Sequence, residues 1–236
     1  MLAKPTLHIA VTGCVHGQLQ KMYEAVHVHE EATGKKVSFL ICCGDFQSLR
    51  TEADFDFFKS NVSHRDLCDF HLYHEKKLTA PILTIFVGGN HEASNVLLNA
   101  FYGGYLAPNI YYMGFVGLVK LFGLRILGVS GIFKFYDVNK PFYYPPERRD
   151  LITMFHSKNF QIEMSKKLQA KSPIDVVFSH DWPQGIVMKG DYQQLYKYQP
   201  GFRKDGPKLG SLVNAKILEE IKPVNWFAGH MHCEYR

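Results

Sequence analysis

The chain has 236 residues, of which 46% are hydrophobic and 21% are charged, so it is long enough to bury a sizeable core and has a globular composition. Its formal net charge of +5 is compatible with an anionic ligand. The five cysteines are odd in number and irregularly spaced, and no apolar stretch approaches the ~18 residues that span a bilayer. These features exclude a disulfide scaffold and a membrane-spanning protein, and they favour a reducing compartment.

Short apolar runs recur along the chain, and each leads into a polar turn. Runs of this length that are rich in β-branched residues predict buried strands. The runs cover residues 7–11, 37–42, 82–87, 176–178 and 225–228.

Two longer stretches have helical periodicity. They cover residues 19–33, followed by Gly34, and residues 209–221, followed by Pro223. Residues 118–131 form two apolar runs about Gly123, which predicts a hairpin and therefore a mixed sheet. Together these elements indicate an α/β protein with two sheets flanked by helices.

Polar residues with metal-ligand chemistry stand just after the predicted strands, where open α/β sheets place their ligands. They are Cys14, His16, Asp45, Asn90, His91, His180, His230 and His232. Each has a structural explanation when taken alone: a histidine that is hydrogen-bonded in the core, a small buried cysteine, or a turn-forming aspartate. Such residues at five strand ends together favour a metal centre.

Four sequence blocks resemble the signatures of the calcineurin-like metallophosphoesterases, in that family's order. The blocks are Gly44-Asp45, Gly89-Asn90-His91-Glu92, His180 and Gly229-His230-Met231-His232. The resemblance implies an α/β/β/α sandwich with mixed sheets and with metals at the sheet edge. We expect residues 1–236 to form a single catalytic domain. The chain ends four residues after His232, whereas the family usually adds strands there, so a shortened and a minimal version both remain open.

The first block departs from the family pattern, because Cys14 stands where the family has aspartate. This departure resembles the RNA lariat debranching enzymes, as do residues 92–95 and the aromatic, basic stretch before residue 150. The resemblance implies hydrolysis of the 2′–5′ linkage of branched lariat RNA, by a nuclear and monomeric protein. The alternatives are a metallophosphatase or nucleotide phosphodiesterase of the same superfamily, and a scaffold without turnover.

The resemblance also implies roles for the strand-end residues. Cys14, His16 and His232 would hold one metal ion, and Asn90, His180 and His230 the other, with Asp45 bridging them. His91 would be the general acid that protonates the leaving 2′ oxygen. The expected cofactors are two divalent ions, Fe²⁺, Zn²⁺ or Mn²⁺, and thiolate and imidazole favour the softer Zn²⁺ or Fe²⁺ over Mg²⁺. The alternative is a degenerate site in which Cys14 binds no metal.

The stretch from Ile132 to Asp150 interleaves aromatic residues with lysine and arginine. Aromatic rings stack on bases and cations follow phosphates, so this composition is typical of single-stranded RNA binding. We expect Asn95, Lys134 and Tyr144 to contact substrate. The alternatives are aromatic residues that pack under the domain, and an Asn95 that caps a helix.

Overall fold

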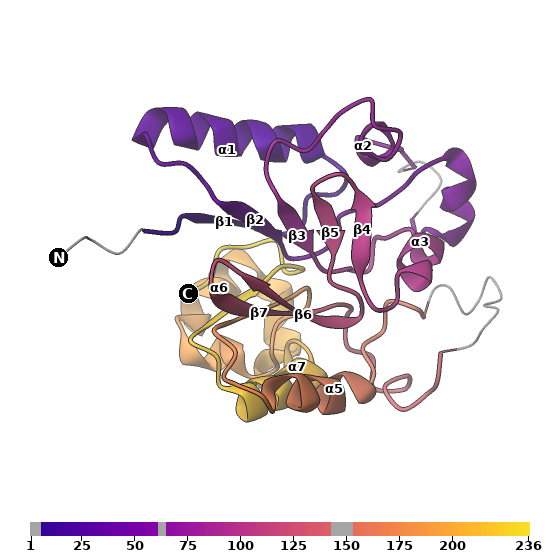
Figure 1. The fold of residues 1–236 in the computed structure, drawn as a ribbon. Helices are drawn as coiled ribbons and strands as arrows, with labels where there is room; N and C mark the ends of the chain where they lie inside the picture. Colours follow the sequence, from indigo (N-terminus) through magenta and orange to yellow (C-terminus); the bar gives the residue numbers. More distant parts are fainter. Residues whose placement is uncertain (1–5, 61–64, 143–152) are drawn as a thin grey trace.

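Two β-sheets stack face to face in the computed structural model, which describes residues 6–60, 65–142 and 153–236 (Figure 1). The first sheet has the order β1 (Ile9–Thr12), β2 (Phe39–Cys42), β3 (Thr84–Phe86), β5 (Ile110–Tyr112) and β4 (Gly104–Ala107). Its strands are parallel except for the edge strand β4, which is antiparallel to β5.

The second sheet has the order β6 (Val116–Leu121), β7 (Leu124–Val129), β8 (Val176–Ser179) and β9 (Asn225–Ala228). The β6–β7 pair is the expected antiparallel hairpin, while β7, β8 and β9 run parallel. Both sheets are therefore mixed, as predicted.

Helices cover the outer face of each sheet. In Figure 1, α1 (Leu19–Thr33) and α2 (Phe70–His74) lie on one side of the stacked sheets, and α5 (Phe160–Gln169) and α7 (Leu212–Ile221) lie on the other. Shorter elements are η1 (Glu52–Phe57), α3 (Ser94–Asn99), η3 (Ile186–Lys189), α6 (Tyr192–Tyr198), η4 (Pro200–Lys204) and η5 (Gly206–Lys208). Within the described ranges, no helix combines the length and the apolar character needed to cross a membrane.

Alternate side chains of each central strand enter different apolar layers. Along β2, Leu40 and Cys42 belong to the layer under α1, whereas Phe39 and Ile41 belong to the layer between the sheets. Val177 of β8 faces a third layer, under α5 and α7. Strands that are buried on both faces lack polar alternation, which explains the uninterrupted apolar runs. The predicted α/β/β/α sandwich is confirmed.

The expected elements are present, with small differences at their ends. The helix predicted from residue 209 begins at Leu212, because the Ser211 hydroxyl accepts a hydrogen bond from the Asn214 backbone N–H and caps it. Helix α1 ends as expected, with Gly34 in the left-handed conformation. Strand β2 begins at Phe39 rather than residue 37. An apolar run indicates burial rather than strand pairing, so its first residues can lie outside the strand.

The layer between the sheets should dominate stability. Ile126 is fully buried in it, so Ile126→Ala should lower the free energy of unfolding by about 2–5 kcal/mol through lost apolar burial and a residual cavity. Val28→Ala, on the exposed face of α1, should change it by less than about 0.5 kcal/mol. Urea denaturation of both variants measures the difference. Equal effects would contradict the layer assignment.

Candidate metal centre

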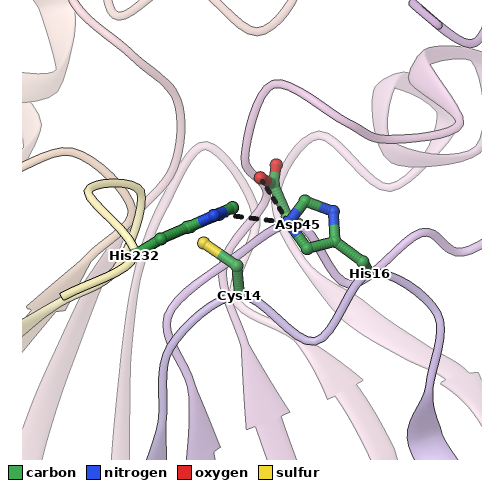
Figure 2. A group of neighbouring side chains, drawn as sticks. All are labelled: Cys14, His16, Asp45 and His232. Atoms are coloured by element: carbon green, nitrogen blue, oxygen red, sulfur yellow. Dashed lines mark hydrogen bonds and ion pairs between the residues drawn. The ribbon is translucent and has the colours of Figure 1, made fainter.

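Three loops at the carboxyl ends of β1, β2 and β9 bring four side chains together. Cys14, His16, Asp45 and His232 each offer one ligand atom, and these atoms all lie within 4.8 Å of one another. The His16 Nε2 atom lies 3.1 Å from His232 Nε2 and 3.8 Å from an Asp45 carboxylate oxygen. Figure 2 shows the four side chains pointing into one shared space.

A second group of predicted ligands adjoins the first. His180 Nε2 lies 3.2 Å from Asn90 Oδ1 and 3.5 Å from Asp45 Oδ1, and its ring centroid is 4.8 Å from that of His230. The His230 backbone N–H donates to Cys14 Sγ at 3.0 Å, which joins the two groups. The structure therefore brings all seven predicted ligands together, with Asp45 between the two groups.

The tautomer of His180 tests whether these residues fit a cation. His180 Nδ1 lies 2.8 Å from the Cys43 carbonyl oxygen, so Nδ1 carries the proton and Nε2 presents a lone pair. That lone pair faces the carbonyl oxygen of Asn90 and the carboxylate of Asp45. Although Asp45 Oδ1 also accepts the His91 backbone N–H, these three acceptor atoms repel one another, and a cation between them removes the repulsion. The donor set fits a divalent metal ion.

Burial sets the protonation states of the site. Burial lowers the pKa of His16 and His180, and it lowers that of His230 to about 4, so these imidazoles are neutral at physiological pH. Burial works against ionisation of Asp45, but the neighbouring histidines and the His91 backbone N–H outweigh it and lower its pKa.

The Cys14 thiol behaves differently. Burial, followed by the negative charge of Asp45, raises its pKa to about 12, so the protein alone holds it as a neutral thiol. A cation at this position would supply the positive charge that releases the proton, because a thiol coordinated to a metal is deprotonated.

Several of these ligands occupy the left-handed region of backbone space. The φ angles are 45° for His16, 48° for Asp45, 65° for His230 and 49° for His232. Non-glycine residues in this region cost roughly 1–3 kcal/mol each and cluster at functional sites. A side chain at Gly89 would overlap the Asp45 carboxylate and the His180 ring, so the turn before Asn90 requires glycine.

Sequence reasoning missed the residues that hold the ligands. The Gln47 side-chain amide lies 3.3 Å from His16 Nδ1, and the Cys43 carbonyl fixes His180. The buried Glu92 carboxylate accepts the backbone N–H groups of Phe46, Gln47 and Gly89 at 2.7–3.2 Å, which ties the Asp45 turn to the Asn90 turn. Burial, with the nearby Asp45 charge, raises the Glu92 pKa to about 8. The sequence signal for Glu92 was its place as the glutamate of the Gly-Asn-His-Glu block.

His91 lies beside the ligand cluster. Its backbone N–H donates to Asp45 Oδ1 at 2.8 Å, and its ring is 5.5 Å from the His16 ring and 6.2 Å from Phe58. This placement is compatible with an acid that acts beside the metals.

The three expected substrate contacts have different environments. Asn95 lies on α3, where its side-chain N–H donates to the buried Asp54 carboxylate at 2.7 Å, and α3 begins without a side-chain cap. Asp54 is also held by the Arg50 guanidinium. Lys134 is half-buried, and its charge is among the lesser causes that lower the pKa of His230. Tyr144 lies outside the described residues. All three roles stay predictions.

Comparison with known proteins identifies the class. The sequence profile of the calcineurin-like phosphoesterases matches residues 7–234. The chain belongs to this family, whose members carry a dinuclear divalent-metal site, and the two joined ligand groups agree with such a site.

The chain is also similar to curated relatives named lariat debranching enzyme. It is 52% identical to the one from Entamoeba histolytica over 235 residues, which cover 100% of this chain and 66% of that protein. It is 44% identical to lariat debranching enzyme A of Xenopus laevis and 43% identical to the human enzyme, in each case over 97% of this chain. The chain covers 43% and 42% of the lengths of those two proteins.

Metal binding should depend on pH through Cys14. Because the thiol pKa is about 12, a bound ion must displace its proton, and the apparent affinity should rise up to about tenfold per pH unit. In Cys14→Asp, burial and Asp45 act on the new group as well, but a carboxyl is a much stronger acid than a thiol, so this contribution should be smaller. Calorimetry in buffers of different ionisation enthalpy counts the protons released. Equal counts for the two proteins would show that Cys14 is not a ligand.

Proposed function

We propose that this chain is the catalytic domain of a metal-dependent phosphodiesterase that hydrolyses the 2′–5′ linkage of branched lariat RNA. The observation that carries the proposal is the similarity of nearly the whole chain to relatives named lariat debranching enzyme. The position of Cys14 within the ligand cluster supports it, because the wider family has aspartate there. A nuclear site of action and a monomeric state are part of the proposal.

Two ions would be held by the two joined ligand groups. Cys14, His16 and His232 would hold one, Asn90, His180 and His230 would hold the other, and Asp45 would contribute one oxygen to each. The thiol and the imidazoles favour Zn²⁺ or Fe²⁺ at the first position, and Mn²⁺ is the harder alternative. When bound, two such ions neutralise phosphoryl charge and lower the pKa of water.

The protein's own part in bond cleavage is proton transfer. When the bond between phosphorus and the 2′ oxygen breaks, that oxygen must gain a proton. The His91 imidazole lies between the ligand cluster and the Phe58 ring and is not committed to a metal in this assignment. His91 therefore donates the proton to the leaving 2′ oxygen, as a general acid.

The residues that follow β7 form a surface whose chemistry suits RNA binding. Phe135 is 83% exposed and Tyr136 is 64% exposed, and the ammonium of Lys140 lies 5.8 Å from the centre of the Tyr136 ring. Exposed rings offer stacking faces to splayed bases, and lysines attract phosphates. Lys134 precedes the two rings and is close enough to His230 for its charge to be felt there. These residues would hold RNA beside the metal centre.

Linkage selectivity tests the proposal directly. Loaded with a divalent metal, the protein should cut a branched RNA at its 2′–5′ linkage and leave a linear 3′–5′ RNA of the same composition largely intact. Denaturing gel electrophoresis separates the products. Equal rates on the two linkages, or activity confined to a small phosphomonoester, would contradict the assignment and favour a general phosphoesterase.

The role of His91 can be separated from metal binding. His91→Ala should retain both metals and lose turnover by about 10²–10⁴-fold, the usual contribution of general acid catalysis. Metal content after dialysis and single-turnover cleavage of branched RNA are the two measurements. His27→Ala, an exposed histidine on α1, is the matched control and should change neither. Loss of metal in His91→Ala would place His91 among the ligands.

A further inference from the structure

A buried cluster of charged side chains lies outside the metal centre. Asp137, His156 and Lys158 are 3%, 3% and 4% exposed. One Asp137 carboxylate oxygen lies 2.9 Å from His156 Nδ1 and 2.9 Å from the Lys158 ammonium, which also donates to the Asp137 carbonyl oxygen at 2.9 Å. Buried charges of this kind are tolerated only when they are paired and hydrogen-bonded, so each member depends on the others.

This cluster joins two segments that are distant in sequence. Around it, the Ile132 backbone N–H donates to the Phe155 carbonyl, and the Ser157 N–H donates to the Ile132 carbonyl. The Asn159 N–H donates to the Val138 carbonyl at 3.1 Å. The segment of residues 132–138 is thereby fixed along its length against residues 155–159.

Residues 132–138, the segment that is fixed in this way, carry the exposed rings of Phe135 and Tyr136. The Tyr136 ring packs edge-on against the His156 ring, with centroids 5.9 Å apart and planes at 87°. At the other end of the segment, the Phe133 backbone N–H donates at 2.9 Å to Asp181, the residue after His180. The cluster therefore supports the Tyr136 ring at one end of a segment whose other end is hydrogen-bonded next to the metal centre.

We propose that Asp137, His156 and Lys158 are positioning residues for substrate, which orient Tyr136 as a stacking face for a base next to the branch. The inference rests on the proposed function and goes beyond it, because it assigns substrate affinity to residues that are buried. Asp137 holds His156, His156 supports the Tyr136 ring, and Lys158 neutralises Asp137. The exposed Lys140 adds a further ion pair with Asp137 at 3.8 Å, so the Asp137 charge is offset on the side that faces the rings as well.

The test compares a substrate that has bases with one that has none. Asp137→Asn combined with Lys158→Met removes both charges without leaving either alone in the interior. This variant should raise the KM for branched RNA roughly tenfold, the effect of weakening one stacked base. Its kcat/KM for bis(4-nitrophenyl) phosphate and its metal content should stay at wild-type values. Lys166→Met, which removes the exposed ion pairs of Lys166 on α5 with Glu163 of the same helix and Glu220 of α7, is the matched control.

A second variant covers the case in which the first fails to fold. His156→Leu keeps the Asp137–Lys158 pair and removes only the ring beside Tyr136, and it should give a similar rise in KM. Combined with Tyr136→Ala, either variant should add little further effect, since the cluster acts through that ring. An unchanged KM, additive effects, or equal losses on both substrates would overturn the inference. A wild type that does not cleave branched RNA would instead overturn the proposed function.

Discussion

The metal centre depends on one buried carboxylate. Asp45 is 1% exposed and accepts a backbone hydrogen bond from His91, and its neighbours include the Cys14 thiol and imidazoles whose pKa burial lowers. An anion removed from water is costly without a countercharge. The neighbouring histidines lower the pKa of Asp45, but burial in turn lowers the pKa of His16 and His180, which limits the positive charge that they supply. The site thus has a requirement for positive charge beyond what its imidazoles supply, in agreement with the dinuclear divalent-metal site of the family to which the chain belongs.

The sandwich meets this requirement because both sheets end at the same edge. The loops after β1, β2 and β3 come from one sheet and those after β8 and β9 from the other, and the contacts of His230 with Cys14 and of His180 with Cys43 join them. Bringing the ligands together places four of them in the left-handed backbone region, which costs conformational energy at each of these residues. The apolar layer between the sheets and the Glu92 carboxylate together keep these turns in place.

The sequence predicted the architecture and the gathering of polar residues at the sheet edge because both follow from local patterns, whereas the metal-binding roles of these residues were implied by the family resemblance. Uninterrupted apolar runs mark strands that are buried on two faces, and histidines directly after such runs must lie at the sheet edge. Contacts made by loops were not predictable in this way. Asn95 meets Asp54 across 41 residues, and Asp137 meets His156 and Lys158 across 19 and 21 residues. No periodicity encodes such pairs, since the course of an irregular segment decides them.

The protein buries two carboxylates with different surroundings, Asp45 at the metal centre and Asp137 beneath the exposed rings. At the metal centre, Asp45 lies among imidazoles whose pKa burial lowers, whereas Asp137 is paired with His156, Lys158 and, at 3.8 Å, the ammonium of Lys140. The difference matters for an anionic substrate. If Asp137 were as unpaired as Asp45, its charge would oppose phosphate beside Lys134 and Lys140. Pairing with His156, Lys158 and Lys140 offsets this negative charge, so the local balance of charge near the exposed rings is more informative than the modest net charge of the chain.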